Sequence, residues 1–121
     1  MRFEDLRVWQ RARGFAGDVQ KLGRGMRGDA GLGDQMRRAA ISIVSNIAEG
    51  CERGSDADFR RFLIMARGSC SEVRAQLYIA LDGGYVDVVR FSSLQSEAEQ
   101  MSAMLNAFIV KLCSGAGAPT A

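Results

Sequence analysis

Apolar residues recur at alternating spacings of three and four in four long segments of the chain. The last two segments carry Phe59, Leu63, Ala66, Cys70, Val73, Leu77 and Ala80, then Phe91, Leu94, Ala98, Met101, Leu105, Phe108 and Leu112. The first two carry Val8, Ala12, Phe15, Val19 and Leu22, then Met36, Ala40, Ile43 and Ile47. This spacing matches one face of an α-helix, whereas a strand needs a period of two. The only proline is Pro119, so no proline interrupts these segments. The pattern predicts four amphipathic helices and no strand.

Glycine clusters separate the four segments. Five glycines lie within 23–33, two within 50–54, and Gly83 and Gly84 follow the third segment. Ser55 and Asp87 are placed to cap the helices that follow them. We therefore expect helices over 4–22, 34–50, 56–82 and 88–113.

Short connections between amphipathic helices favour one all-α domain, an antiparallel up-down-up-down four-helix bundle. We assign the bundle to residues 1–113 and a flexible tail to 114–121. The second and third helices also carry apolar residues outside their main faces. These are Ile41, Val44 and Ala48, then Phe62, Ile64, Met65 and Tyr78. A bundle helix that is apolar on a second side packs against another subunit, so the pattern favours self-association.

The residue types that are missing exclude several classes of function. The chain has no histidine, so it cannot build a Ser-His-Asp triad, a Cys-His dyad or a histidine-ligated metal site. Cys51, Cys70 and Cys113 are far apart, which is typical of reduced cysteines in a cytoplasmic protein. Cys70 and Cys113 lie on or beside the apolar faces, so we expect both in the core, with Cys51 in a loop. No apolar run is long enough for a membrane helix. We predict a protein that is not an enzyme and holds no metal or cofactor.

The segment from Gly23 to Gly28 matches the GxGxxG spacing of dinucleotide-binding loops. That fingerprint requires a strand before the loop and a helix that starts on it. Here a helix comes first, so we interpret the segment as a flexible loop whose two arginines could contact a polyanion.

Arginines are unevenly distributed in this chain, whose net charge is only +2 (16 basic against 14 acidic residues). Arg60, Arg67 and Arg74 are seven residues apart and share one stripe of a helix, with Arg61 beside them. Between residues 59 and 81 the only acid is Glu72. The stripe is therefore either a phosphate-facing surface or a solvated face in an arginine-rich composition. The candidate nucleic-acid-binding residues are Arg37, Arg60, Arg61, Arg67 and Arg74.

Polar residues form a line on the second helix, and a glycine interrupts the third. The line is Arg38, Ser42, Asn46 and Glu49, at i, i+4, i+8 and i+11. Arg38 and Glu49 are predicted to be partly buried and paired, within or between subunits. Gly68 in mid-helix lowers helix stability and usually marks the close approach of another group.

Residues 35–50 (QMRRAAISIVSNIAEG) resemble the signature of the four-helix-bundle protein family, which is also named for proteins encoded in intervening sequences of bacterial 23S ribosomal RNA genes. Residues 3–12, 59–77 and 104–109 resemble the first, third and fourth helices of that family. The first loop departs from the family pattern, because Leu22 is followed by glycine where the family often has proline.

The resemblance implies a homopentameric barrel of four-helix bundles. The implied assembly is similar to the accessory protein of diversity-generating retroelements, which is a basic pentamer that binds nucleic acid and works with a reverse transcriptase. The family signature maps to Arg38, Asn46, Glu49, Ser69 and Glu72, which we interpret as structural or subunit-contact groups. Two functions follow. The chain is either an oligomeric, non-enzymatic nucleic-acid-binding protein, most readily for RNA, or a structural module that docks a protein partner. The salt dependence of binding distinguishes these two functions. Phosphate binding weakens steeply as the salt concentration rises, whereas docking through an apolar surface responds far less.

Overall fold

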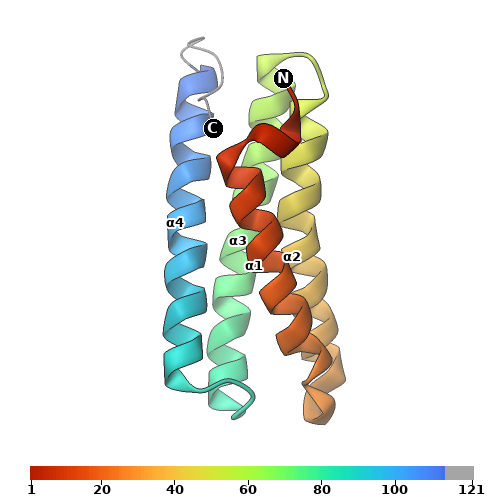
Figure 1. Cartoon of the computed structure of the whole chain (residues 1–121), viewed down its shortest axis with the longest axis vertical. Coiled ribbons are helices and arrows are strands. Elements are labelled where there is room, and N and C mark those ends of the chain that lie inside the picture. Colours follow the sequence, from red (N-terminus) through yellow and green to blue (C-terminus); the bar gives the residue numbers. More distant parts are fainter. Residues whose placement is uncertain (114–121) are drawn as a thin grey trace.

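Residues 1–113 of a computed structural model form an antiparallel bundle of four long helices (Figure 1). The elements are the 3-10 turn η1 (Phe3–Asp5), α1 (Arg7–Arg24), the 3-10 turn η2 (Arg27–Asp29), α2 (Ala30–Cys51), α3 (Asp56–Asp82) and α4 (Val88–Cys113). The predicted four-helix fold is confirmed. The tail assigned to 114–121 lies outside the described residues.

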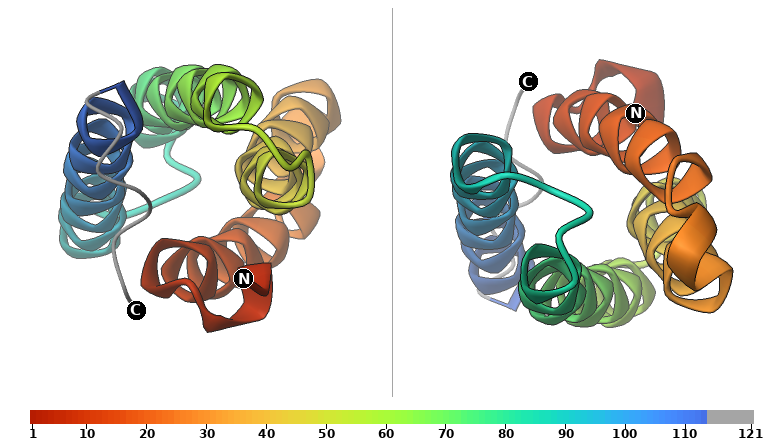
Figure 2. Two further views of the ribbon diagram at one scale, coloured as in Figure 1. Left: turned by 90° about the horizontal axis from the view of Figure 1, so that it is seen from above. Right: turned by 90° about the horizontal axis from the view of Figure 1, so that it is seen from below.

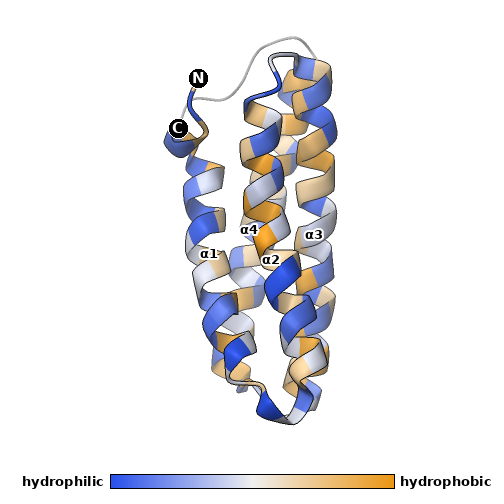
Figure 3. Cartoon of the chain, turned by 90° about the vertical axis from the view of Figure 1, so that its right-hand side faces the viewer, coloured by the Kyte–Doolittle hydropathy of each residue, from blue (hydrophilic) through white to orange (hydrophobic). Residues whose placement is uncertain are grey.

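The periodic apolar residues form the core. All of them are buried except Leu22 and Phe91, which are half-buried. Seen end-on, α1, α2, α3 and α4 surround one common interior in that order (Figure 2). Ile43 on α2 and Leu77 on α3 are both 0% exposed, so the seam predicted for these two helices is correct. Hydrophilic and hydrophobic positions alternate along each helix, as expected when one face is buried (Figure 3).

Side-chain caps set the starts of three helices. The backbone N–H of Asp58 donates to Ser55 Oγ over 3.2 Å, and that of Arg90 donates to Asp87 Oδ1 over 2.7 Å. Both caps were predicted from the sequence. A third cap was not, because Asp29 Oδ1 accepts from the N–H of Leu32 over 3.0 Å. This cap starts α2 at Ala30 instead of at 34.

The glycines before and inside α2 make a tight contact between helices. The loop predicted over Gly23 to Gly28 is shorter than expected, because α1 runs to Arg24 and η2 begins at Arg27. A Cβ on Gly33 would lie 2.6 Å from the carbonyl oxygen of Gly23, and a Cβ on Gly23 would lie 2.8 Å from that of Gly33. Gly28 packs against the hydroxyl of Tyr85. Only residues without a side chain allow the end of α1 to meet the start of α2 this closely. Close packing therefore explains three of these glycines, Gly23, Gly28 and Gly33.

The three cysteines lie in three different environments. Cys70 is 0% exposed on the inner face of α3. Cys113 is exposed at the end of α4, so its predicted place in the core is wrong. Cys51 is half-buried and ends α2 instead of lying in a loop. Within residues 1–113, no helix has the length and apolar character needed to cross a membrane.

Candidate nucleic-acid interface

The α3 arginine stripe, which we define as Arg60, Arg67 and Arg74, runs along the edge where α3 meets α4. Arg67 Nη1 donates to Asn106 Oδ1 on α4 over 2.7 Å. Arg74 Nη2 donates to Glu99 Oε1 on α4 over 3.5 Å. The two helices are antiparallel, and these two contacts lie seven residues apart on each helix. A further step of seven residues therefore places Arg60 level with Cys113, the last residue of α4. The side chain of Arg60 is exposed.

The neighbouring helix neutralises only one arginine of this stripe. Glu99 pairs with Arg74, and both side chains are largely exposed, so the pair contributes little to stability. Asn106 is neutral, so it does not offset the positive charge of Arg67. Within residues 1–113, neither Arg60 nor Arg67 makes an ion pair with a carboxylate. The sequence showed the shortage of acids on α3 but not the acid that α4 supplies.

Arg61 points to a different side of α3 and joins a cluster that the sequence did not reveal. Its guanidinium carbon lies 4.7 Å from the centre of the Phe62 ring, and that of Arg53 lies 4.8 Å from it. Such cation–π contacts hold both guanidinium groups at the α2–α3 end of the bundle. Arg61 also pairs with Asp58 over 3.4 Å, and Arg53 pairs with Glu49 over 3.2 Å. Phe62 is buried in this cluster, so it does not belong to a free apolar surface.

Arg37 braces α1 against α2 and lies apart from the α3 arginine stripe. Its Nε donates to Gln20 Oε1 over 3.1 Å, and Gln20 Nε2 donates back to the Arg37 carbonyl oxygen over 3.1 Å. A third contact joins Arg37 Nη1 to Asp34 over 3.3 Å. The structure therefore does not gather the five predicted arginines on one surface: three lie along α3 and α4, one lies at the α2–α3 end, and one ties α1 to α2.

The polar residues expected to be structural fall into two groups. Ser69 on α3 donates its hydroxyl to Ser42 Oγ over 2.8 Å, and Asn46 Nδ2 donates to Ser42 Oγ and to its carbonyl oxygen over 3.0 Å and 2.9 Å. These three residues form a polar link between α2 and α3. Glu72 is exposed and accepts a long bond of 3.4 Å from Gln76 Nε2.

Arg38 and Glu49 are both exposed, so their predicted burial does not occur within one chain. Eleven residues of helix separate them, or roughly 16 Å of helix rise, which is too far for a direct contact. Glu49 pairs with Arg53 instead. Pairing between subunits stays a prediction.

Residues 4–107 match the family model of the 23S rRNA-intervening sequence protein. The chain belongs to this family. A solved structure is similar to it over 84% of this chain and 97% of the other, with a TM-score of 0.79 and 22% sequence identity. That structure is described as a protein of unknown function from the S23 ribosomal protein family of Bacteroides thetaiotaomicron. At this identity the likeness shows the fold alone. No curated protein matches the chain.

This member of the 23S rRNA-intervening sequence protein family exposes apolar side chains on α2 and α3. Their exposed fractions run from 37% to 57%, and the residues are Ile41, Ile64, Met65, Tyr78 and Ile79. Gly68 lies on the exposed side of α3, and a Cβ placed on it would meet nothing within 4 Å. The close neighbour expected at Gly68 is therefore absent from residues 1–113 of this chain.

Proposed function

We propose that this 23S rRNA-intervening sequence protein is a non-enzymatic, oligomeric RNA-binding protein that contacts phosphates through Arg60 and Arg67. One observation carries the proposal. These two guanidinium groups lie on one edge of the bundle, where α4 offers the neutral Asn106 and no carboxylate to them. The family model is named for an RNA, and this name supports the choice of RNA as the polyanion.

Phosphate contacts account for affinity without sequence specificity. Arginine side chains on one helix edge release counterions when they neutralise phosphates, and they do not enter a groove to read bases. In a ring, each arginine recurs once per subunit. A chain with a net charge of only +2 then presents a concentrated positive surface.

Oligomer formation is part of the same proposal. The exposed apolar residues of α2 and α3 and the open space at Gly68 support a subunit contact on this side. The family resemblance implies a homopentamer, and three widely separated cysteines favour the cytoplasm as its location. A reverse transcriptase is a partner if the gene lies beside a retroelement.

The proposal is tested by fluorescence anisotropy with a labelled, structured RNA. We expect binding at about 50 mM salt and a loss of affinity of at least tenfold at about 200 mM, as for several phosphate contacts. Absence of binding at the lower salt, or an affinity independent of salt, contradicts the proposal.

A protein-docking module is the second candidate, and the exposed apolar side chains of α2 and α3 favour it. Burial of apolar surface is far less sensitive to salt than phosphate binding. A partner captured equally well at both salt concentrations, together with no RNA binding, supports this second function.

A further inference from the structure

An exposed aromatic residue continues the line of the α3 arginine stripe. Every phenylalanine, tyrosine and tryptophan of the chain falls within residues 1–113, and among them Tyr78 alone is exposed. Its exposed fraction is 57%. Tyr78 comes four residues after Arg74, which places it on the same face of α3 and one turn further along. The stripe of positive charge therefore ends at an aromatic ring.

The ring of Tyr78 is held in place with an open face. Its centre lies 5.0 Å from the centre of the Phe91 ring on α4, and the two planes meet at 68° in an edge-to-face contact. Such a contact covers at most one face of either ring, so at least one face of Tyr78 stays open. Within residues 1–113, this contact with Phe91 is the one interaction that fixes the Tyr78 side chain. A ring that is already ordered loses little freedom when a planar group stacks on it.

Tyr78 lies on a different side of α3 from a residue expected at the subunit contact. Its ring meets α4 through Phe91. Met65, in contrast, comes one turn before Ser69, whose hydroxyl contacts Ser42 on α2. We therefore assign Tyr78 to the α3 arginine stripe and leave Met65 to the contact between subunits.

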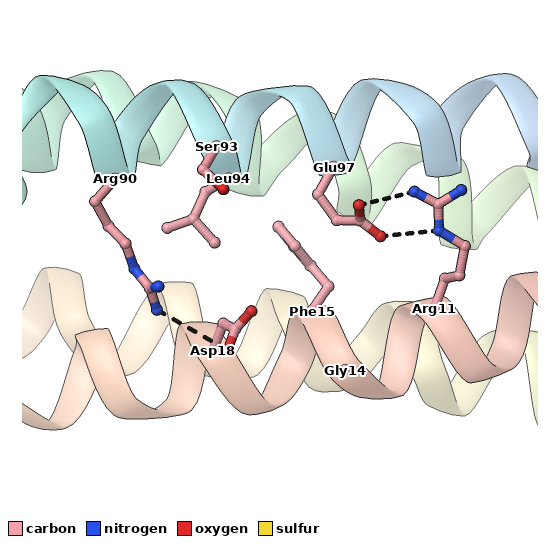
Figure 4. Close-up of a pocket in the computed structure, with 8 residues that line it drawn as sticks. All are labelled: Arg11, Gly14, Phe15, Asp18, Arg90, Ser93, Leu94 and Glu97. Carbon is pink, nitrogen blue, oxygen red and sulfur yellow. Dashed lines mark hydrogen bonds and ion pairs between the residues drawn. The ribbon is translucent and has the colours of Figure 1, made fainter.

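The opposite edge of α4, which faces α1, lacks both features (Figure 4). Arg11 donates to the two carboxylate oxygens of Glu97 over 2.8 Å and 3.0 Å, and Arg90 lies 3.9 Å from Asp18. Each arginine of this edge thus has a carboxylate beside it. Phe15, which lies between the two pairs, is only 2% exposed. This edge offers a polyanion neither an unneutralised arginine nor an aromatic face.

Resting on the proposed function, we propose that Tyr78 stacks on an unpaired base of the RNA whose phosphates bind the α3 arginine stripe. Roughly 27 Å of helix rise separates Arg60 from Tyr78, which spans several nucleotides of a single strand. Stacking on an aromatic ring is open to any base, so it adds affinity without sequence specificity. Asp82 is exposed one turn beyond Tyr78, and its charge would repel a phosphate there. The strand contact should therefore end at Tyr78.

The stacking selects single-stranded over double-stranded RNA. A base inside a duplex is covered by its neighbours on both faces, whereas a base in a loop or a single strand can turn out and stack on a side chain. The arginines alone make no such distinction, because both forms of RNA offer phosphates.

The first test measures affinity for a labelled single-stranded RNA of roughly 12 nucleotides and for a duplex with the same number of phosphates. Tyr78→Leu keeps an apolar side chain but removes the aromatic face. We expect it to lose about tenfold in affinity for the single strand and almost nothing for the duplex. Tyr78→Phe is the matched control and should bind both RNAs as the parent does, because it keeps the ring.

The double variant Arg60→Gln with Arg67→Gln separates this inference from the proposed function. It should weaken binding of both RNAs. If it does so while Tyr78→Leu binds the single strand as tightly as the parent, RNA binding stands and the stacking is wrong. A parent that binds neither RNA refutes the proposed function and the stacking together. Light scattering on Tyr78→Leu should show the oligomer of the parent, and a shift to the monomer would make Tyr78 a subunit contact and overturn the proposal.

Fluorine NMR observes the ring itself. The chain has only two tyrosines, so protein labelled with 3-fluorotyrosine gives two signals, and Tyr78→Phe identifies one of them by its loss. Tyr85 is an internal control, because it is half-buried and its hydroxyl packs against Gly28. We expect the single-stranded RNA to shift the Tyr78 signal and leave the Tyr85 signal unchanged. A Tyr78 signal that does not move while the RNA is bound overturns the proposal.

Discussion

Gly50 at the end of α2 lies directly against Phe62 on α3. A Cβ on Gly50 would lie 2.7 Å from the Cβ of Phe62 and 3.0 Å from Cδ1 of Phe59. Both phenylalanines are buried and cannot move aside freely. The glycine therefore sets how closely α2 and α3 approach each other at this end of the bundle.

We predict that Gly50→Ala lowers the free energy of unfolding by about 1–3 kcal/mol, the usual cost of overpacking a core. The matched control is Gly17→Ala on the exposed side of α1. Its new methyl group meets nothing within 4 Å, so the better helix propensity of alanine should stabilise the protein by ~0.5–1 kcal/mol. Urea denaturation measures both. If the Gly50→Ala protein is as stable as the parent, α2 and α3 can move apart there without loss of stability, and the close contact at Gly50 does not matter.

Ile43 and Leu77 test the core. Both side chains are 0% exposed, so truncation to alanine should cost ~2–5 kcal/mol in each case. Denaturation of the two variants gives these values. Losses below about 1 kcal/mol in both would mean that the two residues do not lie in a packed interior.

The exposed apolar residues of α2 and α3 are predicted to form the contact between subunits. We expect light scattering at micromolar concentration to show a cyclic oligomer, most simply a pentamer, well above the 13.1 kDa of one chain. Ile64→Lys with Met65→Lys should shift it toward the monomer, because charges would enter a buried contact. Val89→Lys, at an apolar residue of α4 that is 81% exposed, should leave it unchanged. A parent protein that elutes as a monomer refutes this prediction.

Cys70 should be chemically protected. Its Sγ donates to the Ala98 carbonyl oxygen over 3.2 Å, and burial raises the pKa of the thiol from 9.0 to about 11. The fold favours the neutral thiol. This contribution to the free energy of unfolding is therefore complete below about pH 9 and is lost as the pH rises toward 11.

Alkylation with iodoacetamide near pH 8, read by mass spectrometry, checks this protection. The exposed Cys113 should react readily and Cys70 only on unfolding. Equal labelling of both cysteines in the folded protein would contradict the burial of Cys70. Replacing Cys70 with alanine should also reduce the loss of stability between pH 9 and 11.

The sequence was sufficient to predict the four helices and their inner faces, because the spacing of apolar residues directly reflects helix geometry. It was insufficient wherever the outcome depends on a neighbouring helix. The glycines from Gly23 to Gly33 indicated a loop, yet Gly23 and Gly33 are the contact point of two helices. The acid that pairs with Arg74 is 25 residues away on α4, so the spacing within α3 could not reveal it.

The candidate site shows the same limit. Seven-residue spacing correctly placed Arg60, Arg67 and Arg74 on one side of α3. It could not show that Arg61, one residue later, turns toward Phe62, or that Arg37 is held by Gln20. Which arginines share a surface depends on the packing of the helices against each other, and this packing appears only in three dimensions.

The most direct test of RNA binding compares two double variants of equal charge in the anisotropy measurement. Arg60→Gln with Arg67→Gln removes two charges from the α3 arginine stripe. Arg7→Gln with Arg13→Gln removes two exposed charges from α1. Both proteins should first be shown to keep the oligomeric state of the parent. We predict that the first variant loses at least about tenfold in affinity for RNA. The slope of its log affinity against log salt concentration should become shallower by about one for each arginine removed, while the second variant stays close to the parent in both quantities. Equal losses in both variants, or no loss in the first, would contradict phosphate binding by the α3 arginine stripe.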